Sequence, residues 1–530
     1  MSPLEELAAW ASAVRLDDAP RRVVELAKSQ VLSQLAAVRG GLRHPLGQAL
    51  VRAFGPPIQP DPARSAVVLS ALGSWLHFDD TAYAGHLSNS TVTVPLAYAL
   101  ARGLDGRALL TAVIAANECA ARITAAATLG PFRGQMAAHT HVAGAVAGRL
   151  RAEDAPARHW VDALGLAFAM PLWSLTHGFM ASDARLLSSS TPVRLGLDAC
   201  DAAAAGLRGA ADILDHPRGF LARFATVPLP EAVTAGLGRC WHTDTLSFKV
   251  HPSGPGSDAA VDCALALHAA LGRPRVDEVV EVEVHVSLYT LLVHRAAAAY
   301  LDGPEPPLSA VATTTPYAVA TALLTGGLEP ADFAHPAVAS PLRWALAAKV
   351  RLVHDEEMTA ALLTAEAPFG EAVRLAGERA VGWLRDFGGD RLVELAREAG
   401  QVMPGVGDAA GSRRRSFATT RRSFATATKM TPARVVLHLA DGASHERRVD
   451  IPVGAAGPDT RSRHRHLVRA KFLATGGSPE VADAVRRLDL LPAAEVRRLV
   501  TAALDMAGRE GPARRAGAAG RERPDVAEAA

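Results

Sequence analysis

The segment GSWLHFDDTAYAGHLSNSTVTVPLAYAL, from Gly73 to Leu100, gathers polar side chains between two apolar, helix-like runs. Its polar residues include Asp79, Asp80, Thr81, His86, Ser88 and Asn89. A polar loop between two helices lies at their ends, where free backbone N–H groups and acidic or imidazole side chains can meet a ligand. Aspartate and serine also cap ordinary helices, so the loop alone indicates either a binding site or a helix boundary.

Helical periodicity extends around this segment, from Pro3 to about Leu271. Apolar residues recur at steps of three and four, as in Val24, Ala27, Val31, Leu35 and Val38. The sequence contains no glycine-rich dinucleotide or phosphate-binding fingerprint, so it indicates no nucleotide cofactor. We therefore expect a helical domain over residues 1–270.

The hydrophobic period changes after residue 271. Val280, Val282, Val284 and Val286 alternate with polar residues, which is the period of a half-buried strand. Further elements are expected at Pro316–Leu324 (helix), Lys349–Val353 (strand), Glu371–Trp383 (helix) and around the Asp441-Gly442 turn (hairpin). The predicted fold is mainly α with a smaller α+β domain over 271–455, and residues 456–507 return to complete the helical domain.

Two segments stand outside this pattern. Residues 411–430 contain RRSFATT followed by RRSFATA, a near-identical tandem repeat, which we interpret as a loop insertion. A basic tether for nucleic acid or a partner is the alternative, but the balanced charge of the chain favours the insertion. Residues 508–530 are rich in Gly, Ala and charged residues and predict a disordered tail.

Composition narrows the class of protein. The chain has 530 residues, 56 Lys and Arg against 54 Asp and Glu, and 49% hydrophobic residues, so no global field attracts nucleic acid or acidic membranes. Its four cysteines are far apart, which suits a reducing compartment. We read no signal peptide and no apolar run long enough to span a bilayer, so the predicted location is cytoplasmic.

A second polar island precedes an alanine- and glycine-rich helix and contains His139, Thr140 and His141. Two histidines two positions apart would share a face only on a strand, and no third ligand is suitably spaced, so no metal is predicted. A helix N-terminus that offers imidazoles and N–H groups to an anion is the preferred functional interpretation. Helix capping by Thr140 is the structural alternative.

Three more positions stand out. Arg185 lies in the first turn of an expected helix, where a cation is poorly placed relative to the helix dipole, so it is a candidate ligand-binding residue. Lys249 precedes a Pro/Gly-rich turn and is either a snorkelling surface group or a carboxylate binder or base. Tyr317 lies in an apolar helix, where core packing with a satisfied hydroxyl is the alternative to catalysis.

Taken in order, these segments resemble the MmgE/PrpD family, which includes 2-methylcitrate dehydratase, cis-aconitate decarboxylase and iminodisuccinate epimerase. The resemblance runs from the N-terminal helices to Lys471-Phe472, about nine-tenths of the chain. HFDDTAYAGHLS resembles the family segment D-F-D-D-T…H-P-S, and AAHTHVAGAVAG resembles H-x-T-x-x-x-G before a small-residue helix. RLLSSS, SFKVHP, TTTPYAVATAL and GAADILDHPRGFL resemble four further family segments. The resemblance thereby matches Asp80, Thr81, His86, Thr140, Gly144, Lys249 and Tyr317 to family positions.

Several positions depart from the family pattern. His77 stands where the family usually has its first aspartate, and Ser74 stands where it has an earlier histidine. The loop between Thr81 and His86 is one residue short, and Arg185 replaces a lysine. The histidine of the second motif falls on Ala138, with His139 and His141 close by. Ser253, Gly254 and Asp258 replace the cysteines and histidine that commonly follow the active-site lysine.

The resemblance implies a homodimer with a large helical domain and a smaller α+β lid, acting without metal or organic cofactor on small di- and tricarboxylates. A proton next to a carboxylate is very weakly acidic, so such a site must bind the carboxylates with cations and stabilise developing negative charge. We expect His139, His141 or Lys249 as base and Tyr317 or His86 as proton donor. The expected substrate-binding residues are His77, Asp80, Thr81, Thr140 and Arg185.

From these expectations, dehydration of a 2-methylcitrate-like hydroxy acid is the first choice. Epimerisation or decarboxylation on the same scaffold is the second, since substitutions among the residues that touch the substrate change specificity while a fold persists. A catalytically altered protein that only binds a ligand is the third. His77 in place of an aspartate keeps that third possibility open.

Overall fold

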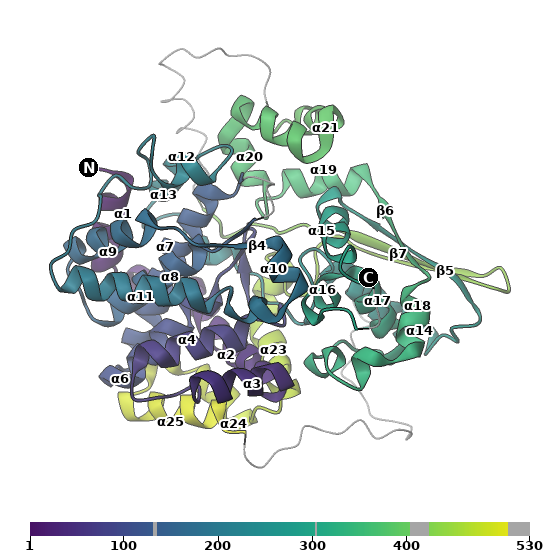
Figure 1. The fold of residues 1–530 in the computed structure, drawn as a ribbon, viewed down its shortest axis with the longest axis horizontal. Helices are drawn as coiled ribbons and strands as arrows, with labels where there is room; N and C mark the ends of the chain where they lie inside the picture. Colours follow the sequence, from purple (N-terminus) through teal and green to yellow (C-terminus); the bar gives the residue numbers. More distant parts are fainter. Residues whose placement is uncertain (131–134, 303–304, 403–422, 507–530) are drawn as a thin grey trace.

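The computed structural model describes residues 1–130, 135–302, 305–402 and 423–506, and shows a helical domain beside a smaller domain that carries the main sheet (Figure 1). The prediction of a mainly α fold with a smaller α+β domain is confirmed. The helical domain begins with α1 (Pro3–Ala13), α2 (Arg21–Arg43), α3 (Pro45–Phe54) and α4 (Pro62–Ser74). It continues with α5 (Ser88–Thr91), α6 (Thr93–Arg102), α7 (Gly106–Ala127), α8 (His139–Ala152), α9 (Ala157–Ala169), α10 (Thr176–Ala181) and α11 (Ser190–Ala204).

Helix α7 lies in the core of this domain and packs on α8. Among the described helices it alone is long and apolar enough to cross a membrane, but 94% of its apolar window is buried inside the protein. A buried apolar helix of this length is also what the core of a large helical domain contains. Helix α7 is buried because its sequence is a run of small and aliphatic residues, which lets neighbouring helices approach closely.

The chain returns to the helical domain at its C-terminal end. Helices α23 (Pro458–Ala474), α24 (Pro479–Val485) and α25 (Ala493–Leu504) lie beside α2, as the yellow and purple ribbons of Figure 1 show. Lys28 on α2 is buried and forms an ion pair with Asp489, which follows α24. Segments more than 400 positions apart therefore share one core.

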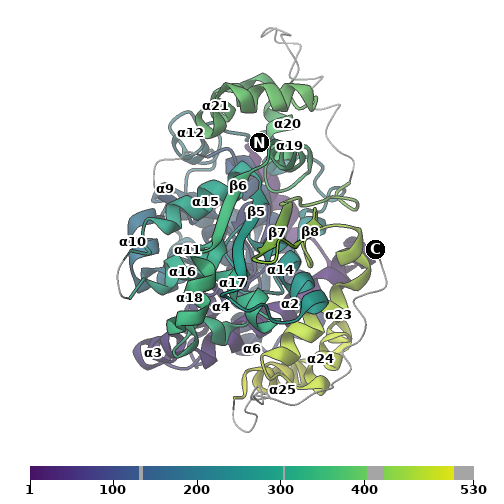
Figure 2. The same ribbon diagram turned by 90° about the vertical axis from the view of Figure 1, so that its right-hand side faces the viewer.

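The α+β domain is built on a four-stranded sheet with the order β6-β5-β7-β8 (Figure 2). The strands are β5 (Val279–Val286), β6 (Val350–His354), β7 (Ala433–Leu439) and β8 (Ser444–Val449). β5 and β6 are parallel, whereas the other pairs are antiparallel. Helices α14 (Asp258–Leu271) and α17 (Thr315–Thr325) pack together beside this sheet, so α14 is packed with the α+β domain although the sequence placed it at the end of the helical one.

Two expectations for this domain need correction. Val280 is not on the buried face of β5 but is 61% exposed, because the pairing with β7 shifts register between Val279 and Glu281. Such a bulge turns one residue out of the alternation. The helix expected over Glu371–Trp383 is interrupted at Gly377, whose φ of 56° separates α20 (Gly370–Ala376) from the turns that lead into α21 (Val381–Glu398).

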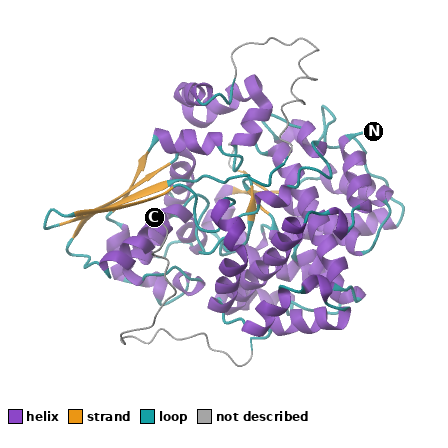
Figure 3. Cartoon of the chain, turned by 180° about the vertical axis from the view of Figure 1, so that it is seen from behind, coloured by secondary structure: helices purple, strands orange, loops and turns teal. Residues whose placement is uncertain are grey.

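The remaining sheet elements are short hairpins inside the helical part, visible as small strands among the helices in Figure 3. They are β1 (Thr81–Ala82) with β2 (Gly85–His86), and β3 (Gln135–Ala137) with β4 (Trp173–Leu175). Most of the repeat predicted as an insertion, residues 411–422, and the tail predicted at 508–530 lie outside the described residues. The described part resumes at Ser423, close to the first hairpin.

Candidate active site

The loop between α4 and α5 has an unusual backbone that is fixed at both ends. His77 and Tyr83 have φ angles of 51° and 52°, a left-handed conformation that costs a non-glycine residue about 1 kcal/mol or more. The Tyr83 hydroxyl hydrogen-bonds to His242 Nδ1 at 2.9 Å, and the backbone of Thr81 pairs with Ser247. Strained residues held by their surroundings in this way are concentrated at functional sites.

Asp79 and His86 form the polar centre of this loop. His86 Nδ1 lies 2.8 Å from Asp79 Oδ2, which also accepts a hydrogen bond from Asn89 at 2.7 Å. Burial alone would raise the pKa of Asp79, but the charge and hydrogen bond of His86 outweigh burial and keep that pKa below its ordinary value. With Nδ1 directed at the carboxylate, the Nε2 atom of His86 is available to exchange a proton, and this side chain is 27% exposed.

Asp80 points to the other side of the loop, toward α23. Its carboxylate accepts hydrogen bonds from Ser33 at 2.6 Å and Ser88 at 3.0 Å, and it lies 3.9 Å from Lys471 Nζ. Burial raises the pKa of Asp80 to about 6 and lowers that of Lys471 to about 8. The sequence predicted Asp80 as a substrate-binding residue, but its carboxylate oxygens are already occupied by Ser33, Ser88 and Lys471.

Arg185 and His77 lie together beneath this loop. The guanidinium of Arg185 hydrogen-bonds to His77 Nε2 and to the Trp75 carbonyl oxygen, and it packs over the Phe179 ring at 4.8 Å. Burial, followed by the positive charge of Arg185, lowers the pKa of His77 well below its usual value, so this imidazole is neutral. Burial also lowers the pKa of Arg185 to about 9, and no carboxylate forms an ion pair with it in the described part of the chain.

The three predicted residues of α8 occupy its first turn, and their side chains diverge as a helix requires. His141 is near the Asp79–His86 pair, whose charges act on it, while His139 packs against Phe220 and Phe224. Burial lowers the pKa of His141 to about 4 and that of His139 to about 3, so both are neutral near pH 7.

Thr140 lies behind the first hairpin. Its hydroxyl shares a 2.6 Å hydrogen bond with Thr124, and a Cβ atom on Gly85 would lie 2.9 Å from its Oγ1. The motif residue Gly144 has a similar packing role, since a Cβ there would lie 2.2 Å from Ser90 Oγ. Small residues at these positions let α8 approach the loop closely.

Lys249 joins the cluster from the segment before α14. Its Nζ lies 3.1 Å from Asp258 Oδ1 and donates to the Ser253 carbonyl oxygen. Ser253 also donates to Asp258 at 2.8 Å. Ser253 and Asp258, two of the positions that depart from the family pattern, are thus the residues that hold Lys249.

The sequence did not indicate Lys429, which the structure brings to the same cluster. Its Nζ donates to Thr81 Oγ1 at 2.9 Å, and its backbone N–H donates to Ala456. Burial, and to a smaller extent the charge of Lys249, lowers the pKa of Lys429 to about 8. Lys429 belongs to the last part of the predicted insertion, where no helix or strand period could mark it as a site residue.

Thr313 is a second residue that sequence reasoning missed. Its hydroxyl lies 3.2 Å from His77 Nε2, so α16 (Leu308–Thr313) of the α+β domain reaches the loop. Asp79, which the sequence noted but did not select, is a third. The direction of its side chain could not be predicted, because adjacent residues in a loop follow no fixed alternation between two faces.

Tyr317 is not brought to this cluster. Its hydroxyl donates to the Asp332 carbonyl oxygen at 2.6 Å and lies 3.2 Å from an Arg343 nitrogen, and its ring packs against Phe333 and Trp344. The structure therefore gives Tyr317 the alternative role considered from the sequence, core packing with a satisfied hydroxyl. Of the two expected proton donors, only His86 lies in the cluster.

The cluster thus combines a carboxylate–imidazole pair, neutral buried imidazoles and three cations. Its members are Asp79, His86, His77, His141, Arg185, Lys249 and Lys429, with Thr81 and Thr313 as hydroxyl partners. Among the described residues, no group of three histidine, cysteine or acidic side chains is arranged to hold a metal ion. The arrangement can bind a multiply charged anion and move a proton beside it.

Comparison with known proteins identifies the family of this chain. The model of the MmgE/PrpD N-terminal domain matches residues 5–231, and that of the MmgE/PrpD C-terminal domain matches residues 251–397. No curated protein matches the chain in sequence. The two domain matches cover most of the chain and include the loop, the α8 histidines, Arg185 and Thr313. The chain therefore belongs to the MmgE/PrpD family, which includes hydro-lyases and related enzymes.

Proposed function

We propose that this protein is a cofactor-independent lyase that acts next to a carboxylate of a small di- or tricarboxylate. Elimination of water from a 2-methylcitrate-like hydroxy acid is the first choice. The observation that carries the proposal is a pair of cations in the cluster, the buried Arg185 and the half-buried Lys429, that form no ion pair within the described residues. Family membership supports the lyase class.

The uncompensated cations indicate an anionic substrate. Burying a charge without a partner costs several kcal/mol, and a bound carboxylate offsets that cost. His77 has a direct part here, because a neutral imidazole in place of the family's aspartate leaves the positive charge of Arg185 uncompensated, so that it can attract a substrate carboxylate. Two such cations, one from each domain, suit a substrate with two or more carboxylates.

The groups around His86 supply the proton transfers. In the elimination, Nε2 of His86 takes the proton from the carbon next to a carboxylate. Asp79, at Nδ1, stabilises the imidazolium that forms. Lys249, whose Nζ forms an ion pair with Asp258, is placed to donate a proton to the departing hydroxyl, which leaves as water. This assignment exchanges two expected roles. His86, expected as a proton donor, becomes the preferred base in place of His139, His141 or Lys249, and Lys249 becomes the donor in place of Tyr317 or His86.

An epimerase is the second candidate, favoured by one specific observation. The rings of His77 and His86 lie 5.4 Å apart with an interplanar angle of 34°, and His141 is close to the same pair. Inversion next to a carboxylate needs two groups that exchange protons on opposite faces of one carbon. The imidazoles of His77 and His86 could supply these two groups if a substrate bound at their edges.

Incubation with hydroxy and unsaturated polycarboxylates, followed by NMR in deuterated water, tests these possibilities together. Loss of water supports the dehydratase, deuterium exchange without loss of water supports the epimerase, and carbon dioxide release supports a decarboxylase. Saturable binding without any of these leaves a binding protein. His86→Gln should abolish turnover, while His159→Gln, a matched change elsewhere, should not. Undiminished turnover in a Lys249→Ala, His139→Ala double variant would contradict the site assignment.

The same preparation tests the proposed assembly. We expect a homodimer, as the family resemblance implies, and sedimentation velocity reports it directly. Activity measured at protein concentrations on both sides of dimer dissociation would reveal whether one protomer is sufficient.

A further inference from the structure

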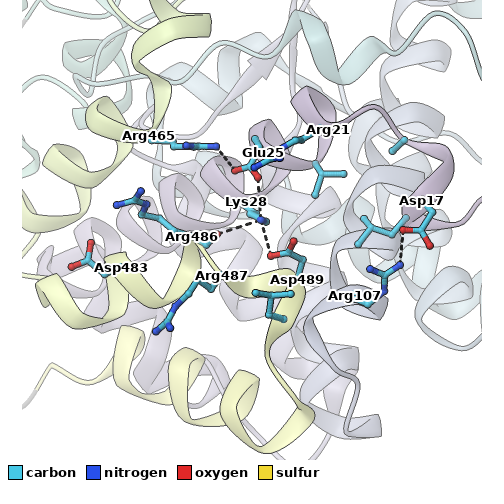
Figure 4. Close-up of a pocket in the computed structure, with 14 residues that line it drawn as sticks. Asp17, Arg21, Glu25, Lys28, Arg107, Arg465, Asp483, Arg486, Arg487 and Asp489 are labelled. Carbon is cyan, nitrogen blue, oxygen red and sulfur yellow. Dashed lines mark hydrogen bonds and ion pairs between the residues drawn. The ribbon is translucent and has the colours of Figure 1, made fainter.

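A cavity of about 820 Å³ lies where α2 begins and the C-terminal helices return to it (Figure 4). It is lined from four segments: the turn before α2, the first two turns of α2, the start of α7, and residues of α23 to the end of the short helix after α24. None of its lining residues belongs to the candidate active site. Its volume is in the range of small-molecule sites, about 300–1,000 Å³.

The charges around this cavity do not balance. Its ten charged lining residues are Asp17, Arg21, Glu25, Lys28, Arg107, Arg465, Asp483, Arg486, Arg487 and Asp489. Every acid among them has a cation. Glu25 pairs with Lys28 and Arg465, Asp489 with Lys28, and Asp17 with Arg107. Asp483 faces Arg469 at 3.5 Å.

Three of the arginines that line the cavity have no acidic partner among the described residues. Within the described ranges, the side chains of Arg21, Arg486 and Arg487 form no hydrogen bond or ion pair, whereas the other cations lining the cavity are paired. Figure 4 shows Arg486 and Arg487 on one side of Lys28 and Arg21 near the start of α2 on the other. The surplus positive charge is therefore contributed by two separate parts of the chain.

The start of α2 adds to the same field. Its N-cap is Pro20, which provides no capping side chain, and its first turn contains no acidic residue. The N-terminal end of a 23-residue helix carries partial positive charge, and a basic residue there is unfavourable unless an anion is near. Both the arginines and the helix end would be stabilised by one negatively charged ligand.

We propose that this cavity binds a phosphorylated small molecule. Guanidinium groups match phosphate oxygens in bidentate geometry, and three unpaired arginines around one cavity suit a ligand with more than one phosphate charge. Leu16 and Val24 line the cavity, and Leu490, which is 74% exposed, contributes apolar surface at its edge. An apolar or planar body attached to the phosphate would cover these residues.

Equilibrium dialysis with labelled pyrophosphate and with a labelled nucleoside triphosphate, at 50 and 150 mM salt, tests the proposal on the full chain. We expect saturable binding of one or both, weaker at the higher salt. An Arg486→Gln, Arg487→Gln double variant should bind at least tenfold more weakly. The matched control is Arg208→Gln, Arg218→Gln, which removes two exposed arginines outside the cavity and should bind like the wild type.

The two probes separate the contribution of the phosphate charge from that of the apolar or planar part of the ligand. Tighter binding of the nucleotide than of pyrophosphate supports a role for the apolar wall, and equal binding supports recognition of phosphate alone. The proposal is wrong if the wild type shows no saturable binding at either salt concentration, if both double variants lose affinity equally, or if citrate binds and neither phosphate compound does. It is also wrong if the Arg486/Arg487 variant changes the sedimenting mass while the wild type binds no anion, because the cavity is then a contact between copies.

Discussion

Replacing Lys471 by methionine should destabilise the fold without removing a substrate contact. Lys471 Nζ donates to Ser33 Oγ at 2.7 Å and to the Phe78 carbonyl oxygen, and it is the cation nearest to Asp80. Removing one partner of a buried ion pair costs about 3–5 kcal/mol because the other charge stays buried. Ser33 and Ser88 still donate to Asp80 in the variant, so we expect about 3 kcal/mol at pH 8.

The penalty should depend on pH with a definite sign. The pKa of Asp80 in the folded protein, about 6, lies above its unfolded value, so ionisation of Asp80 costs stability as the pH rises through the folded pKa. Removing Lys471 raises that pKa further. The penalty should therefore shrink as the pH falls from 8 to 5, by up to ~1.4 kcal/mol per pH unit.

Urea denaturation followed by circular dichroism measures the loss at pH 5 and pH 8, using the first transition. The control is Lys28→Met, which removes a buried lysine whose partners Glu25 and Asp489 are partly exposed. This variant should lose about 1 kcal/mol or less of the free energy of unfolding. The double variant Asp80→Asn, Lys471→Met should recover most of the stability and keep its turnover. A double variant no more stable than Lys471→Met would refute the pairing of Asp80 with Lys471. A folded double variant without turnover would indicate that Asp80 contacts the substrate after all.

Three further outcomes are expected. Lys429→Ala should raise KM for a polycarboxylate tenfold or more, and in the wild type KM should rise above pH 8, where Lys429 loses its proton. Lys429→Arg should bind, and its KM should begin to rise only near pH 9, where Arg185 loses its proton; steady-state kinetics across pH 6–9.5 measures both. Asp79→Asn should lower kcat by at least a hundredfold with a small change in KM, since it removes the partner that orients His86. A hundredfold rise in KM with an unchanged kcat would contradict this role. Gly144→Ala should lower the melting temperature by several degrees in a thermal scan, because the new Cβ meets Ser90, and an unchanged value would show that α8 can shift.

Much of the fold could be predicted because it depends on periodic patterns. The apolar repeat of α2, the alternation of β5 and the Asp441-Gly442 turn each specify a local structure, and Gly442 has the positive φ that such a turn requires. Val280 was misplaced because a bulge depends on pairing with β7, which lies more than 150 positions away in the sequence. The pattern of one strand contains no information on its partner's register.

The candidate site was predicted less completely because it depends on the directions in which loop side chains point. Two adjacent acids in the loop face opposite sides, Asp79 toward His86 and Asp80 toward Lys471, and only the backbone of the loop decides which is which. Lys429 follows a basic repeat and precedes β7, so neither helical nor strand periodicity distinguishes it from a surface lysine. Arg185 was singled out by its place in the sequence, but its hydrogen-bond partner His77 could be identified only in three dimensions.

The return of α23 to α2 has a consequence for synthesis on the ribosome. Lys471 is 393 positions after Phe78, the residue whose carbonyl it binds. At about 5–20 residues per second, roughly 20 to 80 s pass between the emergence of the loop and the arrival of this lysine. During that interval the first helices lack both their cation and the covering of α23, so the nascent chain exposes apolar surface that a chaperone would recognise. The loop of the candidate site cannot take its final form until nearly the whole chain has been made.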